Sequence, residues 1–209
     1  MTDTCCGKTI DVRALEARQR RVLVIVLIIN LATFAMMLAA AIYSDSSSLL
    51  SGGLDNFGDA LTYALSLAVV GASGRAKAWV ALLKGGLILA AAIAVAIQIG
   101  WRLAYPQVPV FEAIGIAALL NLAANIVCLR LLTPYRHGDV NMGSAWECSH
   151  NDVGEGVAVL AAAVGVWWFD AVWPDLVVAS ALLLMFLRSG WRVFRAALRE
   201  LRSAANAPP

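Results

Sequence analysis

The stretch LSGGLDNFGDALTYALS, Leu50 to Ser66, places Asp55 and Asp59 inside an otherwise apolar run. Because the two carboxylates are four residues apart, they lie one turn apart on the same face of a helix. A carboxylate at the centre of a bilayer costs several kcal/mol, so the pair is stable only where a cation or protons balance it inside a bundle. The stretch predicts one half of an intramembrane cation site. The alternative is a structural polar seam.

The composition of the chain is that of a membrane protein. Of the 209 residues, 61% are hydrophobic, and the mean hydropathy of +0.76 is too high for a soluble domain of this length. Cys5 and Cys6 are adjacent, whereas Cys128 and Cys148 lie in apolar segments, so no disulfide framework is predicted. The first residues, 1–21, are polar, and we expect no cleavable signal peptide.

The apolar segments predict an all-α membrane protein with six transmembrane helices. The predicted spans are 22–43, 49–72, 79–103, 110–132, 143–169 and 172–187. A polar N-terminal arm, 1–21, precedes them, and a basic amphipathic tail, 188–209, follows. Lys and Arg gather in the arm, in the loops after the second and fourth helices and in the tail, so both termini are predicted to be cytoplasmic. An even number of helices requires the same arrangement.

The fifth segment, SAWECSHNDVGEGVAVLAAA, carries a second set of polar residues. Cys148 and Asp152 are four residues apart and share a helix face, which Glu155 joins three residues further on. His150 points elsewhere. We expect His150 and Glu155 to lie at an entrance or against the ligands rather than to bind metal directly. Cys148 alone would be read as a small buried hydrophobe, and its spacing from Asp152 favours a ligand.

The two segments together supply four metal ligands, the number that a tetrahedral divalent site needs: Asp55, Asp59, Cys148 and Asp152. With all four deprotonated the site carries about four negative charges, of which one divalent ion cancels half. Protons must cover much of the remainder. Metal and protons therefore compete for the same groups, which is the physical basis of a metal/proton antiporter.

These features resemble the cation diffusion facilitator family. The likeness runs from the first helix to the sixth, and is carried by SSLLSGGLDNFGDAL in the second and NMGSAWECSHNDVGEGVAVLAA in the fifth. It implies a six-helix bundle, a homodimer, and a central transport site at Asp55, Asp59, Cys148 and Asp152. The family more often has His where Cys148 stands, which bears on the metal preference. Its members commonly continue into a cytoplasmic ferredoxin-like domain, for which the tail 188–209 leaves no room.

Outside this site, three features allow a structural reading and a functional one. The tail carries arginines at spacings of three and four, which predicts an amphipathic helix at the lipid headgroups; the alternative is a continuation of the sixth helix. Asn121 and Asn125 share a face of the fourth helix and are expected to make helix–helix hydrogen bonds. Cys5 and Cys6 could capture soft metal ions or could be two idle thiols.

We therefore expect a proton-coupled exporter of divalent metal ions, not an enzyme, since no nucleophile triad or nucleotide-binding motif is visible. Zn²⁺ is the favoured cargo, with Cd²⁺ or another transition metal possible, and no permanently bound cofactor is expected. The expected setting is a bacterial inner membrane, with no nucleic-acid partner. Two alternatives stay open: a soft-metal (Hg or Cu) binding or transport protein built around the thiols, and a non-transporting membrane interaction subunit.

Overall fold

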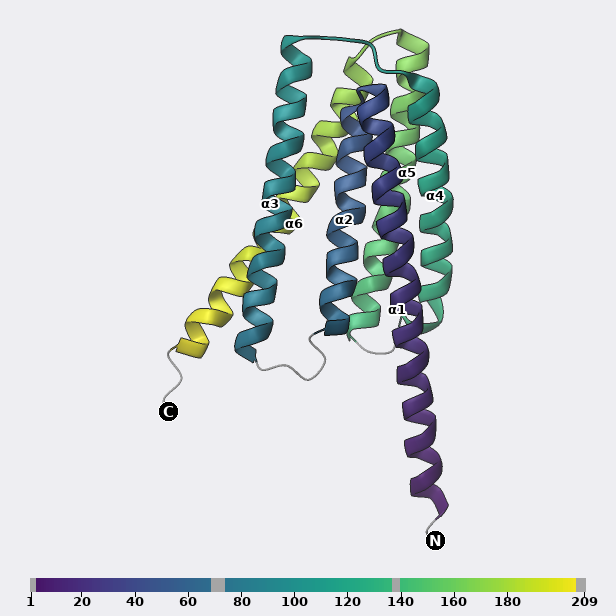
Figure 1. Cartoon of the computed structure of the whole chain (residues 1–209), viewed down its shortest axis with the longest axis vertical. Helices are drawn as coiled ribbons and strands as arrows, with labels where there is room; N and C mark the ends of the chain where they lie inside the picture. The colour runs from purple at the N-terminus through teal and green to yellow at the C-terminus, as the bar shows by residue number, and fades with distance from the viewer. Residues whose placement is uncertain (1–2, 69–73, 137–139, 206–209) are drawn as a thin grey trace.

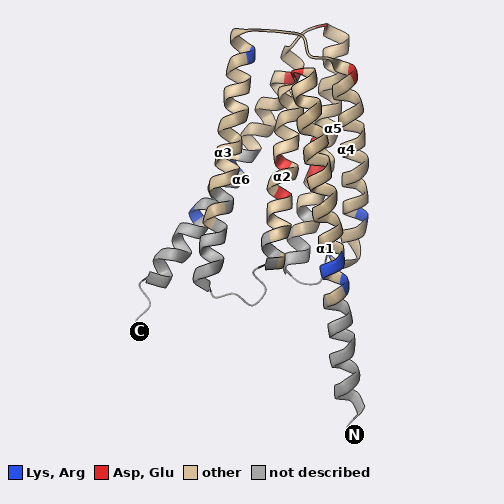
Figure 2. Ribbon diagram, viewed as in Figure 1, with Lys and Arg blue, Asp and Glu red and all other residues tan. Residues whose placement is uncertain are grey.

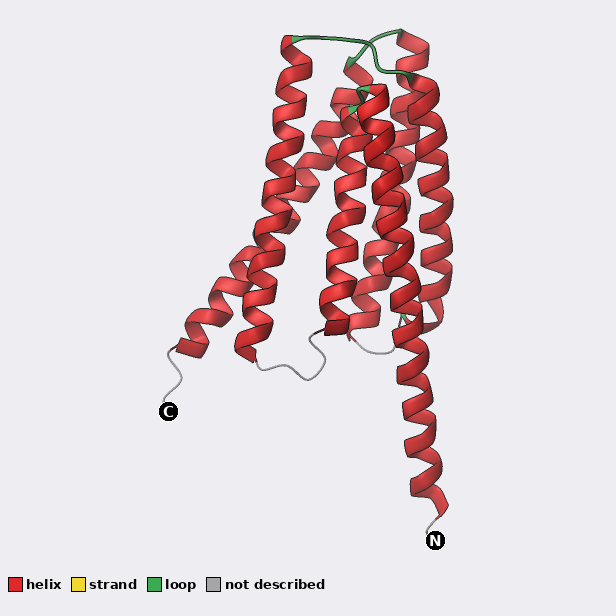
Figure 3. Ribbon diagram, in the orientation of Figure 1, coloured by secondary structure: helices red, strands yellow, loops and turns green. Residues whose placement is uncertain are grey.

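The computed structural model describes the backbone of residues 3–68, 74–136 and 140–205, and within these most side chains from residue 17 onward. Every regular element in the described ranges is helical (Figures 1 and 3). The elements are α1 (Asp3–Ser44), α2 (Ser47–Ala68), α3 (Gly74–Ala104), α4 (Phe111–Leu132), the short 3₁₀ turn η1 (Thr133–Tyr135), α5 (Val140–Phe169) and α6 (Trp173–Ala205). The prediction of an all-α fold with six long helices is confirmed.

The first and last helices are longer than the sequence predicted. The polar arm continues α1 back to Asp3, and α6 runs on through the basic tail to Ala205 in one helix. Neither extension contains proline, and both are rich in residues that favour helices, so nothing in the chain ends the helix there. Of the two interpretations of the tail, the structure matches the second, in which the tail continues the sixth helix. Its position at lipid headgroups stays a prediction.

Among the residues that the structure describes, four helical stretches are long and apolar enough to cross a membrane: 17–44, 86–104, 111–135 and 148–169. A shorter apolar stretch, 173–185, lies in α6. Large apolar side chains are exposed along the outside of the bundle, among them Ile28, Ile93 and Ile116. Such a surface suits contact with lipid rather than with water.

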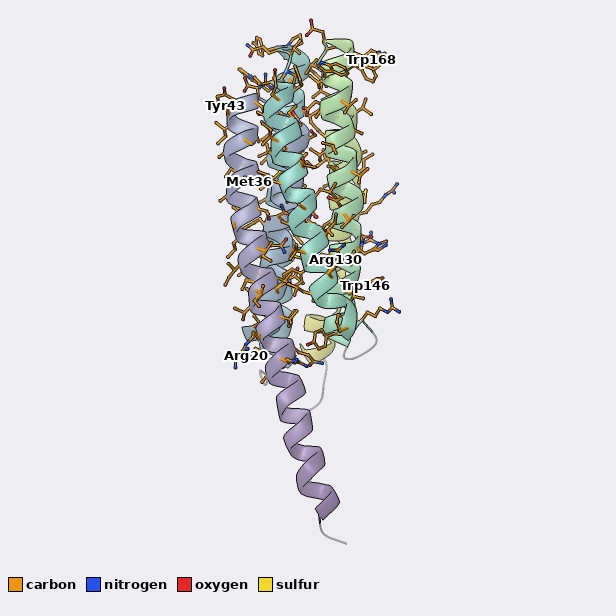
Figure 4. The ribbon with its side chains drawn as sticks, turned by 90° about the vertical axis from the view of Figure 1, so that its right-hand side faces the viewer. Arg20, Met36, Tyr43, Arg130, Trp146 and Trp168 are labelled. Atoms are coloured by element: carbon orange, nitrogen blue, oxygen red, sulfur yellow. The ribbon has the colours of Figure 1, made fainter. Side chains whose placement is uncertain are left out.

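The bundle has two unlike ends. The terminal end is where α1 begins and α6 ends, and the far end carries the α1–α2, α3–α4 and α5–α6 connections (Figure 1). Tyr43 and Trp168 lie towards the far end in Figure 4, whereas Arg20 lies towards the terminal end. Aromatic rings gather at the interfaces of a membrane and basic residues on its cytoplasmic side. This distribution supports the predicted orientation, with the terminal end in the cytoplasm.

The helices form two groups. In the first, α1 packs on α2 and α4 packs on α5, and contact between α1 and α4 joins the two pairs. In the second, α3 packs on α6, and this pair lies beside the four-helix group in Figure 1. Contacts of α2 with α3 and α6, and of α5 with α6, connect the groups. The helix that carries Asp55 and Asp59 therefore belongs to the bundle and also borders the pair.

Two glycines let the helices of the bundle approach closely. A Cβ atom added to Gly53 of α2 would lie 3.1 Å from the Cβ atom of Met37 on α1, and one added to Gly156 of α5 would lie 3.2 Å from Leu122 on α4. Both distances are tighter than ordinary packing, so a side chain at either position would push two helices apart. Small residues serve this purpose in membrane helices generally.

At the far end, one buried carboxylate of α6 holds the start of α2. Asp175 accepts hydrogen bonds from Ser46 Oγ (2.6 Å), Ser47 N (2.7 Å), Ser48 N (3.2 Å) and Ser48 Oγ (2.5 Å). It satisfies the free N–H groups of the helix start and complements the positive end of the helix dipole. Asp175, 127 to 129 positions along the chain, thus caps the N-terminus of α2, a role that the residue just before a helix usually has.

The turn between α1 and α2 is also tied to α3. Arg102, whose side chain is 4% exposed, forms a salt bridge with Asp45, whose backbone has a φ of 59°. Aspartate tolerates this left-handed conformation better than most residues. The backbone N–H of Val110 donates to the carbonyl of Ser44 (3.1 Å). The far end of α2 is therefore fixed to both helices of the α3–α6 pair.

Candidate metal centre

Four helices contribute buried polar residues at the same level of the bundle. They form a polar layer, made of Asn30 of α1, Asn56 and Asp59 of α2, Asn121 and Asn125 of α4, and Asp152 of α5. Figure 2 shows acidic residues about half-way along α2. Each side chain of the layer is 9% exposed or less. Burying this many polar groups in a membrane bundle is costly, and such groups mark functional sites.

Apolar clusters close the polar layer on both sides. Towards the far end lies a cluster that includes Met37, Leu49, Ile114 and Val159. Towards the terminal end lies a second cluster, which includes Val26, Tyr63, Cys128 and Ala145. Both clusters draw on the same four helices as the layer. The carboxyl groups thus lie between two apolar clusters along the length of the bundle.

The predicted carboxyl groups of α2 and α5 converge in this layer. Asp152 is close enough to Asp55 and Asp59 to interact with both electrostatically. Glu155 is likewise close enough to interact with Asp55. Two carboxylates can hydrogen-bond only when one of them carries a proton, and otherwise they repel each other. Each of these contacts therefore calls for a proton or a cation.

A small cavity opens beside these groups, with a volume of about 10 Å³, roughly what one water molecule needs. Its lining comes from α2, α4 and α5 and consists of Gly52, Asp55, Asn56, Asn121, Asn125, Asp152, Glu155, Gly156 and Val159. Sequence spacing placed Glu155 on the same face as Asp152, and the structure places it in the lining. The expected role of Glu155 beside the ligands thus has support from its position.

Cys148 is partly exposed and is not part of a disulfide. It is near enough to Tyr63 to interact with it electrostatically, one turn nearer the terminal end than Asp152. Within the described ranges, no three Asp, Glu, His or Cys side chains are placed closely enough together to hold a metal ion. The structure therefore brings the three aspartates into one region, and the four-ligand shell with Cys148 stays a prediction.

Tyr63 is a contact of the site that sequence reasoning missed. Its side chain is 1% exposed, and its hydroxyl lies 3.1 Å from Asp59 Oδ2, to which it donates, and 3.4 Å from the carbonyl oxygen of Ala145 on α5. Tyr63 thus positions Asp59 and ties α2 to α5 on the terminal side of the site. The available signal was its spacing of four residues from Asp59, which places both on one helix face.

The two asparagines of α4 differ in their surroundings. Asn121 Oδ1 accepts a hydrogen bond of 2.8 Å from Asn56 Nδ2, so the predicted helix–helix hydrogen bond is confirmed for this residue. For Asn125 it is not, because Asn125 Oδ1 is buried without a partner among the described residues. Asn56, which the sequence analysis passed over, follows directly after Asp55.

Of the remaining candidate residues, only His150 has a described side chain, and it does not line the cavity. His150 is exposed, and its ring lies 5.4 Å from that of Trp146, so its described contact is with an aromatic ring and not with a predicted ligand. A role of His150 beside the ligands gains no support from this position. The side chains of Cys5 and Cys6 lie outside the described residues.

Comparison with known proteins agrees with this geometry. The family model of the cation efflux transmembrane domain matches residues 23–202, a range that begins in α1 and ends in α6. No curated protein sequence matches the chain. The family match covers far more than half of the chain and includes both acidic helices. The chain therefore belongs to the cation efflux family, whose members are integral membrane transporters of divalent metal cations and not enzymes.

Proposed function

We propose that the protein is a proton-coupled exporter of divalent metal ions, with Zn²⁺ as its favoured cargo. The observation that carries the proposal is the convergence of Asp55, Asp59 and Asp152 in one region, with an apolar cluster on each side of it along the bundle. A carboxylate cluster of this kind needs balancing charge. A divalent ion supplies part of that charge in one step of transport, and protons supply it in the other.

The proposed ligands are Asp55, Asp59, Cys148 and Asp152. Their chemistry favours Zn²⁺ or Cd²⁺, because a thiolate binds these ions well and binds hard ions poorly. When a metal ion enters, carboxyl protons must leave, and they return when the metal departs. One metal ion thus moves against protons, and the exchange is close to electroneutral.

The architecture supports alternating access around this site. Apolar clusters lie on both sides of the polar layer along the bundle, and we propose that an ion passes to either side when one of them opens. The four-helix group and the α3–α6 pair are separate packing units that meet chiefly at α2 and α5. We propose that movement between these units opens the site to one side at a time.

Transport by reconstituted protein tests the proposal. Proteoliposomes would be given Zn²⁺, Cd²⁺, Co²⁺ or Mn²⁺, with and without a pH gradient and with the membrane potential clamped. We expect Zn²⁺ uptake to rise when protons can flow the opposite way. Metal uptake that ignores the pH gradient would contradict proton coupling, and absence of uptake for every metal would contradict transport. Where aspartate variants of the site are compared, Asp170→Asn is the control variant, since Asp170 is exposed at the end of α5 and should not affect transport.

One competing function is tested by the same preparation. A soft-metal binding protein built around the thiols would bind Hg²⁺ or Cu⁺ in a fixed ratio to thiol without moving protons. The carboxyl groups favour the exporter, because thiol capture alone gives no reason to bring three aspartates together inside a membrane bundle. Both the homodimer and the cytoplasmic placement of the terminal end belong to this proposal as well.

A further inference from the structure

The cavity beside Asp152 is lined by an oxygen atom that has no partner. Asn125 is 1% exposed, and no described N–H or O–H group donates to its Oδ1 atom. The Oδ2 atom of Asp152, on the facing helix, is buried and lacks a donor as well. A buried acceptor left unsatisfied costs about 1–3 kcal/mol. Two such acceptors beside one cavity call for an occupant that donates hydrogen bonds or carries positive charge.

The other asparagine of α4, Asn121, does have a partner for its side-chain oxygen. It lies one turn from Asn125 on the same face and lines the same cavity. Its Oδ1 atom, however, is taken by Asn56 Nδ2 at 2.8 Å. One asparagine therefore joins α4 to α2, whereas the other leaves its oxygen free for the contents of the cavity.

We propose that Asn125 supplies an uncharged oxygen ligand from α4 to the cation held by Asp55 and Asp152, and so determines which metals the protein carries. A neutral amide oxygen enlarges the coordination shell without adding negative charge. Ions such as Mn²⁺ and Co²⁺ accept oxygen ligands and larger shells, whereas Cd²⁺ gains more from a thiolate such as Cys148. Asn125 thus widens the range of metals towards oxygen-preferring ions.

Metal binding to the detergent-solubilised full chain tests this assignment. Cys5→Ser and Cys6→Ser would be present throughout, so that the N-terminal thiols add no Cd²⁺ binding. Asn125→Leu removes the oxygen and fills its space. We expect it to lower the affinity for Mn²⁺ and Co²⁺ by roughly tenfold or more, and that for Cd²⁺ by less. Asn125→Asp keeps an oxygen and adds charge, so the ratio of Mn²⁺ to Cd²⁺ affinity should rise.

The visible absorption of bound Co²⁺ gives a readout that a purely structural role would not change, because it reports the number and type of ligands. It should differ between the unaltered protein and Asn125→Leu. Asn151→Leu is the matched control: Asn151 is exposed on α5 and does not line the cavity, so the affinity ratio and the spectrum should stay the same. A cavity that holds only a water molecule would leave both ratio and spectrum unchanged in Asn125→Leu, which would overturn the assignment.

The assignment of Asn125 rests on the proposed metal transport. The experiment must therefore distinguish a wrong role for Asn125 from a wrong proposed function. If Asp152→Ala abolishes Co²⁺ binding but neither Asn125 variant changes the ratio, only the role of Asn125 is overturned. If the unaltered protein binds no divalent ion, both are overturned. Should Asn125→Leu not yield folded protein, Asn125→Asp decides alone, and an unchanged ratio there overturns the assignment.

Discussion

Asp59 and Asp152 are the two proposed ligands that the structure buries most completely, at 9% and 4% exposure. We expect Asp59→Ala and Asp152→Ala each to abolish Zn²⁺ transport in proteoliposomes, because three ligands bind a divalent ion too weakly. Each variant should still elute as a folded protein in detergent, and Asp170→Asn should transport normally. Near-normal flux in either alanine variant would remove that residue from the site.

Cys148 tests whether sulfur contacts the ion. Cys148→His keeps a ligand suited to Zn²⁺ but loses the thiolate that Cd²⁺ prefers. We expect Zn²⁺ transport to be retained and the ratio of Cd²⁺ to Zn²⁺ transport to fall. Competition between the two metals in unaltered and variant protein measures this ratio. An unchanged ratio would mean that Cys148 only packs in α5.

At Gly53, α2 approaches α1 so closely that one added side-chain atom matters. Gly53→Ala would place a Cβ atom 3.1 Å from that of Met37, so the helices must shift. We expect a loss of about 1–3 kcal/mol, seen as a lower melting temperature in detergent. Gly86→Ala is the control, because a Cβ atom there meets nothing within 4 Å. Equal melting temperatures for the two variants would contradict the close packing.

The start of α2 depends on a carboxylate from α6. Asp175→Asn turns one of the two acceptor atoms into a donor that opposes the N–H of Ser47 or the groups of Ser46 and Ser48. We expect a loss of about 2 kcal/mol or more, because charged hydrogen bonds at buried positions are lost. Glu112→Gln, in the exposed first turn of α4, should have little effect. Urea or thermal unfolding of both variants in mild detergent measures the difference.

For the whole molecule, α1 begins and α6 ends at one end of the bundle. We expect protease-sensitive tags fused to the N-terminus and to the C-terminus to be cleaved together in inside-out vesicles and protected together in intact cells. The basic residues near that end predict that this side is the cytoplasm. Cleavage of only one tag in either preparation would contradict an even number of crossings.

The sequence by itself determined the number of helices, the membrane class and which polar residues share a helix face. These features follow from local periodicity, because residues four apart on one helix stay together whatever surrounds them. For this reason the spacing of Asp55 from Asp59, and of Asp152 from Glu155, indicated the two acidic faces before any packing was known. The true ends of α1 and α6 were less predictable, since composition distinguishes apolar from polar segments better than helix from coil.

Only the tertiary structure decided which groups from other helices complete those faces. The bond between Asn56 and Asn121 joins residues 65 positions apart, and Asp175 reaches across more than 120 positions to the start of α2. Spacing places a residue on a face, but helix packing decides what that face meets. Asn121 and Asn125 have the same sequence signature and line the same cavity, and yet the oxygen of Asn121 accepts from Asn56 while that of Asn125 has no partner among the described residues. Which side chain bonds to another helix depends on the position and rotation of all the helices together, and a one-dimensional pattern does not contain these quantities.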